Sequence, residues 1–79
     1  MATAEENARR LLKALVGTGH QAEVAIPNAQ VQTIATEAGI DGDDQDAALR
    51  SAGARGWIAA GPRDGTAVIT RDGWDNRDA

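Results

Sequence analysis

Acidic side chains gather in the stretch Asp41-Gly-Asp-Asp-Gln-Asp46, and carboxylate oxygens are the ligands that calcium prefers. An EF-hand loop that began at Asp41 would need glycine at its sixth position and glutamate at its twelfth. The sequence has Asp46 and Ala52 at these positions. The spacing therefore does not fit calcium, and we predict no metal site. Aspartates at the start of a helix are explained by capping and by the positive end of the helix dipole.

Side chains that could carry catalysis are scarce. The chain contains one histidine, His20, and no cysteine, so cysteine catalysis and thiolate metal sites are excluded. The stretch Gly61-Pro-Arg-Asp-Gly-Thr66 is only superficially similar to a phosphate-binding loop, because it lacks the lysine and the following helix. So short a chain also leaves little room for a ligand-sized pocket. We expect no enzymatic activity, no cofactor and no small-molecule substrate, and we assign His20 no role.

Length and charge limit the class of protein further. A chain of 79 residues is predicted to form one domain, residues 1–79. No apolar run approaches the ~20 residues that cross a bilayer, and the start of the chain lacks the pattern of a signal peptide, so we predict a cytoplasmic protein without membrane contact. The net charge of −4 argues against strong non-specific DNA binding. The preference for arginine and alanine is typical of a GC-rich bacterial or phage genome.

Apolar residues at helical spacing predict a first helix over residues 4–16. Thr3 has the spacing to Glu6 of a capping box, which satisfies free amides at a helix start. The apolar stripe comprises Ala8, Leu11, Leu12, Leu15 and Val16. The cations of this segment fall on the other side and are predicted to form a solvated face; they are Arg9, Arg10 and Lys13.

Two more helices are predicted in the middle of the chain. One covers residues 29–38, with Asn28 as its N-cap and Gly39 as its stop. The other covers residues 43–55 and begins in the acidic stretch. Gly53 lies inside it, and a glycine there costs about 1 kcal/mol relative to alanine.

The strands are predicted on either side of these helices. Residues 23–26 alternate polar and apolar side chains and suit a short edge strand. Residues 57–70 are rich in β-formers around the turn Gly61–Gly65 and predict a hairpin. Gly56 precedes it, because glycine adopts the left-handed backbone that ends helices. The short strand would pair with the hairpin in a three-stranded sheet.

The hairpin also has a predicted register. If Ala60 pairs with Thr66, then Ile58 lies opposite Val68. After the hairpin, residues 75–79 are predicted to be a flexible tail.

The most specific pieces of the sequence lie near its end. Leu49-Arg50-x-x-x-x-Arg55-Gly56-Trp57-Ile58 passes from a helix through glycine into a strand. A hairpin with Arg63 at its tip follows, and the chain leaves it through Ile69-Thr70-x-x-Gly73, where Thr70 is placed to cap a turn and Trp74 to fold back on the sheet. In these features, and in the order of its elements, the chain resembles the winged helix-turn-helix family. The resemblance implies an α+β fold with three helices, a short strand and a C-terminal β-hairpin wing.

The resemblance also implies DNA binding, as a small transcriptional regulator or an accessory factor. The third helix would enter the major groove of double-stranded DNA, where Arg50 reads guanine and Ser51 lies beside it. Arg63 would contact the minor groove or a phosphate. Arg55 and Arg71 would hold the DNA backbone. In some winged helices the first helix also touches the DNA backbone, so a backbone contact by its three cations is the open alternative to a solvated face.

The acidic start of the third helix favours a second hypothesis. Near phosphates each unpaired carboxylate is repelled, so DNA binding would need a homodimer or a partner domain to supply positive charge. Winged helices also serve as protein-interaction modules. In that case the acidic helix would dock on a basic partner surface, as in a phage or plasmid factor. The two hypotheses differ in whether the arginines at 50, 55, 63 and 71 gather on one face or are each neutralised by a carboxylate.

Overall fold

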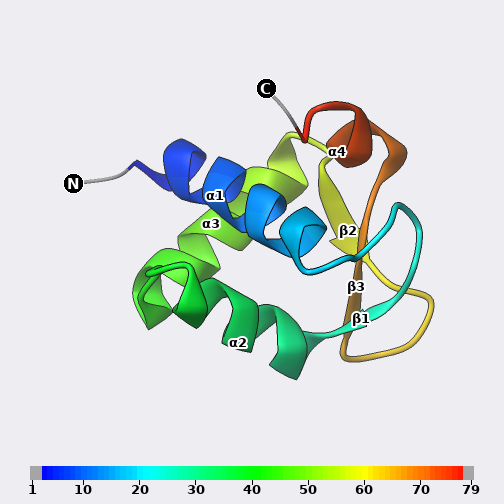
Figure 1. Cartoon of the computed structure of the whole chain (residues 1–79), viewed down its shortest axis with the longest axis horizontal. Coiled ribbons are helices and arrows are strands. Elements are labelled where there is room, and N and C mark those ends of the chain that lie inside the picture. The colour runs from blue at the N-terminus through cyan, green and yellow to red at the C-terminus, as the bar shows by residue number, and fades with distance from the viewer. Residues whose placement is uncertain (1–2, 78–79) are drawn as a thin grey trace.

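The computed structural model describes residues 3–77, which form four helices and three strands. The helices are α1 (Ala4–Gly17), α2 (Asn28–Glu37), α3 (Gly42–Ala54) and α4 (Arg71–Asp75), and the strands are β1 (Ile26–Pro27), β2 (Ile58–Ala60) and β3 (Thr66–Ile69). The three larger helices pack together, with α1 lying across α3, and the small sheet and α4 flank them (Figure 1). The order α1-β1-α2-α3-β2-β3 confirms the predicted α+β class and is winged-helix-like.

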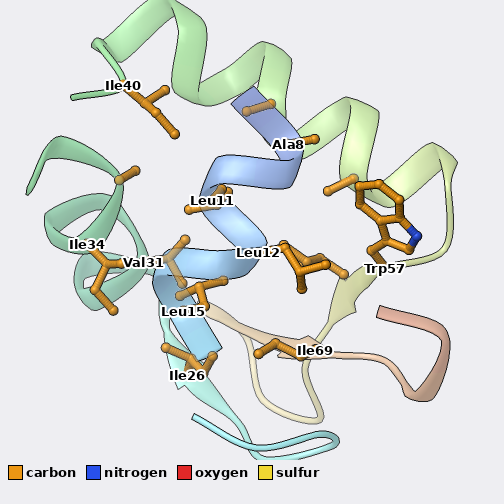
Figure 2. Packing of buried hydrophobic residues seen from close by; sticks show 14 residues of the cluster. Ala8, Leu11, Leu12, Leu15, Ile26, Val31, Ile34, Ile40, Trp57 and Ile69 are labelled. Carbon is orange, nitrogen blue, oxygen red and sulfur yellow. The ribbon is translucent and has the colours of Figure 1, made fainter. Parts of the chain in front are cut away.

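The core forms where α1 meets the other elements (Figure 2). The apolar stripe of α1 supplies Ala8, Leu11, Leu12 and Leu15, which are all buried. Alanines 48 and 52 of α3 face them, and these small side chains let the two helices approach closely. Trp57 closes the core at the end of α3. The helical periodicity thus predicted the buried face of α1 correctly.

Gly39 ends α2 and begins the turn to α3, as predicted. Gly39 has a φ of 82°, the left-handed conformation that favours glycine, and α2 ends at Glu37. The next residue, Ile40, is buried, and its amide donates to the carbonyl of Ala35 at 3.0 Å. This bond satisfies a carbonyl at the end of α2 and anchors the turn in the core.

One predicted helix cap is wrong, and the acidic stretch caps α3 by position only. Asn28 is the first residue of α2 and not its cap, because β1 runs directly into the helix and Pro27 occupies the N-cap position. Asp41 is the N-cap residue of α3, but its side chain makes no capping hydrogen bond. The two aspartates of the first turn of α3, at 43 and 44, still lie at the positive end of its dipole.

β1 lies further along the chain than predicted. The strand is Ile26–Pro27 and not 23–26, because Glu23 has a φ of 65° that interrupts the extended chain. β1 pairs with β3 and forms one edge of the sheet, whose order is β1-β3-β2. Proline is tolerated there because an edge strand needs no amide on its open side.

The hairpin is shifted by one residue from the predicted register. Ile58 lies opposite Ile69 and Ala60 opposite Ala67, whereas the prediction placed Val68 opposite Ile58. A shift of one residue exchanges the two faces of a strand. The observed register puts both isoleucines on the core face, where they are buried, and leaves Val68 half-exposed. Burial of the larger apolar pair therefore decides the register.

The hairpin leaves the sheet through a capped helical turn, as predicted. The hydroxyl of Thr70 accepts a hydrogen bond from the amide of Gly73 at 3.0 Å and donates one to the carbonyl of Gly56. Gly73 is buried against the backbone of Trp57: a Cβ on Gly73 would lie 2.9 Å from the Trp57 carbonyl carbon and 3.0 Å from its Cα. Only glycine fits this contact.

The predicted tail begins inside a helix. Asp75 belongs to α4, and the guanidinium of Arg77 lies 4.3 Å from the centre of the Trp74 ring. Trp74 is half-buried and packs against the core, so the indole ring on which Arg77 stacks is held in place. Residues 78 and 79 of the predicted tail lie outside the described residues.

Replacement of Gly53 by alanine is expected to stabilise the protein by up to ~1 kcal/mol, because alanine loses less backbone entropy in a helix. The site has room, since an added Cβ would meet only the carbonyl oxygen of Ile58, at 3.8 Å. Thermal unfolding should show a rise in Tm of roughly 4–8 °C. The matched change Gly39→Ala should lower Tm, because Gly39 has a positive φ. Equal effects of the two substitutions would contradict this account.

Candidate nucleic-acid interface

Arg50 lies on the face of α3 that points away from α1. The buried residues of α3 are Ala48 and Ala52, and the helical turn of ~100° per residue places Arg50 on the opposite side. Arg50 is exposed and has no ion pair or side-chain hydrogen bond to any residue from 3 to 77. Ser51 is half-buried at the border of this face. The structure therefore leaves Arg50 available to a ligand.

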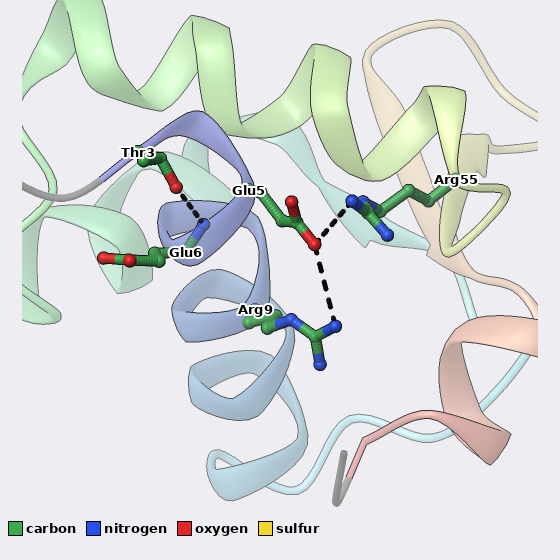
Figure 3. A network of polar contacts seen from close by, with 5 residues as sticks. All are labelled: Thr3, Glu5, Glu6, Arg9 and Arg55. Carbon is green, nitrogen blue, oxygen red and sulfur yellow. Dashed lines mark hydrogen bonds and ion pairs between the residues drawn. The ribbon is translucent and has the colours of Figure 1, made fainter.

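Arg55 makes contacts with other side chains of the protein. Its guanidinium lies 2.5 Å from the carboxylate of Glu5 at the start of α1 and 5.3 Å from the centre of the Trp57 ring (Figure 3). Arg9 shares the same partners, at 3.8 Å from Glu5 and 5.3 Å from the ring centre. This cluster of Glu5, Arg9, Arg55 and Trp57 connects α1 to the end of α3. Arg55 is thus paired with the carboxylate of Glu5 and not with that of a nearby aspartate. Because Glu5 is shared with Arg9, these three side chains keep one net positive charge.

The predicted solvated face of α1 is confirmed for Arg10 and Lys13, which are exposed, and is wrong for Arg9. Arg9 is half-buried in the cluster just described. Arg10 donates hydrogen bonds to the side-chain oxygen of Asn7 at 3.3 Å and to the carbonyl of Ala38 at 2.5 Å, so it caps the end of α2. Lys13 alone of the three is exposed without such a contact among residues 3–77.

Arg63 lies at the tip of the wing, in the predicted turn between β2 and β3. Its side chain is exposed and has no ion pair within the described part of the chain, while its carbonyl accepts from the amide of Thr66 at 3.2 Å. The carbonyl of Gly65, in the same turn, accepts from the amide of Asn28 at 2.8 Å. This bond ties the wing tip to the first residue of α2.

Arg71 lies at the other end of β3 from Arg63. It is the first residue of α4, directly after Thr70, and is exposed. The four residues of β3 separate it from the wing by roughly 13 Å. Among the five predicted contact residues, Arg50 and Arg63 are exposed without an ion pair to residues 3–77, Ser51 is half-buried, Arg55 is paired with Glu5, and Arg71 is remote from the wing tip.

The α2–α3 connection carries the strongest charge. Its exposed carboxylates have no ion pair among residues 3–77, and the sequence between the first and the last of them holds no cation; they are Glu37, Asp41, Asp43, Asp44 and Asp46. One cation reaches this connection from α1, since the guanidinium of Arg10 donates to the carbonyl of Ala38. These five acidic residues, from the end of α2 through the first turns of α3, lie directly before Arg50 in the chain. They are together called the acidic surface below.

Gln45 is a positioning residue that the sequence did not reveal. Its side-chain amide donates to the carbonyl of Ile40 at 2.7 Å and to the hydroxyl of Thr36 at 3.0 Å. These bonds fix the first turn of α3 against α2. A glutamine within a run of aspartates gives no periodic signal, so only the tertiary structure shows its role.

Other kinds of site find no support within residues 3–77. No pocket opens on the surface, and no three histidine or carboxylate side chains are grouped to hold a metal ion. None of the helices there has both the length and the apolar character that crossing a membrane requires. No family model, curated protein or solved structure matches the chain.

Proposed function

We propose that this winged-helix-like protein binds double-stranded DNA, as a small cytoplasmic regulator or accessory factor, with Arg50 of α3 in the major groove and Arg63 of the wing on the minor groove or backbone. The observation that carries the proposal is the exposed, unpaired state of these two arginines on α3 and the hairpin, the elements through which winged helices read DNA. Arg55, already paired with Glu5, has no part in it.

The acidic surface repels phosphates, so we expect this binding to be weak. It would also depend on only two arginines. With Arg50 on a base and Arg63 on a phosphate, one phosphate is neutralised, so the logarithm of the binding constant should fall with the logarithm of salt concentration at a slope of about −1 for one bound copy. A homodimer would double both the arginines and the slope. Binding by one copy should thus be strongest at low salt and fall about tenfold for a tenfold rise in salt concentration.

Substitution of each arginine tests the proposal. Arg63→Ala should weaken binding equally for all sequences and make the salt slope shallower by about 1, because a backbone contact carries no sequence information. Arg50→Ala should cost about 1–3 kcal/mol and also reduce sequence preference. Fluorescence anisotropy with labelled duplexes measures both effects. Lys13→Ala, which removes an exposed cation on the far side of α1, is the matched control.

A chemical-shift titration locates the contact surface. ¹⁵N-labelled protein is titrated with a mixed-sequence duplex at low and at near-physiological salt. Shifts concentrated at Arg50, Ser51 and Arg63, and absent at Lys13, support the proposal. If neither arginine variant differs from the parent protein, or no residue shifts at low salt, DNA binding by this surface is wrong.

A second candidate function is favoured by the acidic surface itself. Its five unpaired carboxylates match a basic protein surface by charge and would steer the encounter. The same titration with an arginine-rich peptide in place of DNA tests this function. Shifts confined to residues 37–46 favour docking there, whereas shifts spread equally over the glutamates of α1 and the aspartates of α4 show non-specific attraction.

A further inference from the structure

The outward face of α3 mixes hydrogen-bond donors with acceptors. Asp43 and Arg50 lie seven residues apart and therefore nearly in line along the helix, with Asp46 and Ala47 on the turn between them. The two aspartates and Arg50 are exposed. An ionised carboxylate only accepts hydrogen bonds and a guanidinium only donates them, so the face presents a defined order of acceptor, acceptor and donor.

These charged groups are not used to hold the fold. Asp43, Asp46 and Arg50 have no side-chain hydrogen bond or ion pair to residues 3–77, although Asp46 and Arg50 have the i, i+4 spacing that permits a pair. Asp46 also lies beyond the first helical turn, where the attraction of the helix dipole for a carboxylate is small. Ala47 between them is short, so it permits close approach of the helix to another surface.

The major groove offers partners of both kinds. Guanine presents two acceptors to a guanidinium, and cytosine presents an amino donor to a carboxylate. Thymine has an acceptor at the corresponding position, where it repels a carboxylate. A helix with this face therefore gains from guanine and cytosine and loses at thymine. The same carboxylates are repelled by phosphates, which lowers binding to all other sequences.

We propose that the outward face of α3 selects a site that contains guanine and cytosine, with Arg50 on guanine and Asp46 on the amino group of cytosine. The inference rests on the proposed DNA binding and adds its sequence preference. Four residues span about 6 Å along a helix, or roughly two base steps, so the two bases should lie about two steps apart. Asp43, about 10 Å from Arg50, reaches roughly one step further.

The test compares base preference and not affinity alone. Parent protein and three variants are each used to select from a pool of duplexes with a randomised centre, at low salt. Asp46→Asn should change the preferred base at one position from cytosine to adenine, because asparagine pairs with adenine through two hydrogen bonds. The preference of the parent for cytosine over thymine there should be about tenfold and should be lost in the variant. Arg50→Ala should remove the guanine preference about two steps away.

Asp75→Asn provides the matched control. It removes the same charge from an exposed position in α4, so it should leave base preference unchanged. Selection of identical sites by the parent and Asp46→Asn, in a protein that does bind duplexes, overturns this inference and leaves DNA binding in place. Failure of the parent to retain any duplex at low salt overturns the proposed function itself, and the arginine-rich peptide then tests the acidic surface as a protein site.

Discussion

Replacement of Gly73 by alanine is expected to destabilise the protein by about 3 kcal/mol or more, a large effect for a surface helical turn. The cause is a close approach of two backbone segments. The added Cβ would overlap the backbone carbonyl group of Trp57, and no rotation of a side chain can relieve this overlap. Relief would require α4 to move off the sheet and to break the hydrogen bonds of Thr70.

Thermal unfolding followed by circular dichroism measures this effect. A loss of 3 kcal/mol lowers Tm by roughly 12–24 °C in a domain of this size. The chemically identical change Gly17→Ala is the control, because an added Cβ there meets nothing within 4 Å. The indole resonance of Trp74 reports separately on whether α4 has detached. Indistinguishable unfolding curves for the two alanine variants would show that the close approach of Gly73 to Trp57 is not a real constraint.

Leu11→Ala is expected to cost about 2–5 kcal/mol, the range for truncation of a fully buried leucine. Leu11 is 0% exposed and points from α1 into the space between α2 and α3 (Figure 2). A cavity there removes contacts with two helices at once. Because a chain of 79 residues has a thin stability margin, the variant should be partly unfolded at room temperature.

Urea unfolding, with tryptophan fluorescence as the signal, tests this prediction. The midpoint should fall markedly for Leu11→Ala while the slope m stays unchanged, because the amount of surface exposed on unfolding is nearly the same. Lys13→Ala, two residues further along α1 and exposed, should leave the midpoint almost unchanged. A midpoint for Leu11→Ala equal to that of Lys13→Ala would place Leu11 outside the core.

The features that the sequence predicted correctly depend on local chemistry. The buried face of α1 followed from apolar spacing, and the ends of α2 and α3 followed from Gly39 and Gly56, whose φ angles of 82° and 75° only glycine adopts readily. The Thr70 cap likewise needs only the next three residues. Such signals lie within a few positions of one another, so a sequence reveals them.

The features that were missed depend on contacts between distant segments. The hairpin register was set by burial of Ile58 and Ile69 against helices elsewhere in the chain. Arg50 and Arg63 are exposed, and their roles stay predictions, whereas the pairing of Arg55 with Glu5 joins the end of α3 to the start of α1. Charge type can be read from a sequence, whereas the partner of a charge is known only after folding.

The order of strands in the sheet has a consequence for biosynthesis. β3 is the central strand, and both β1 and β2 pair with it and not with each other. Because β3 is also the last strand along the chain, β1 stays unpaired during synthesis until almost forty further residues have been added. Helices α1, α2 and α3 can associate earlier, through contacts made within residues 4–54. We therefore expect a nascent chain that ends before Thr66 to be a loose helical intermediate, which becomes cooperative and protease-resistant only once β3 has emerged.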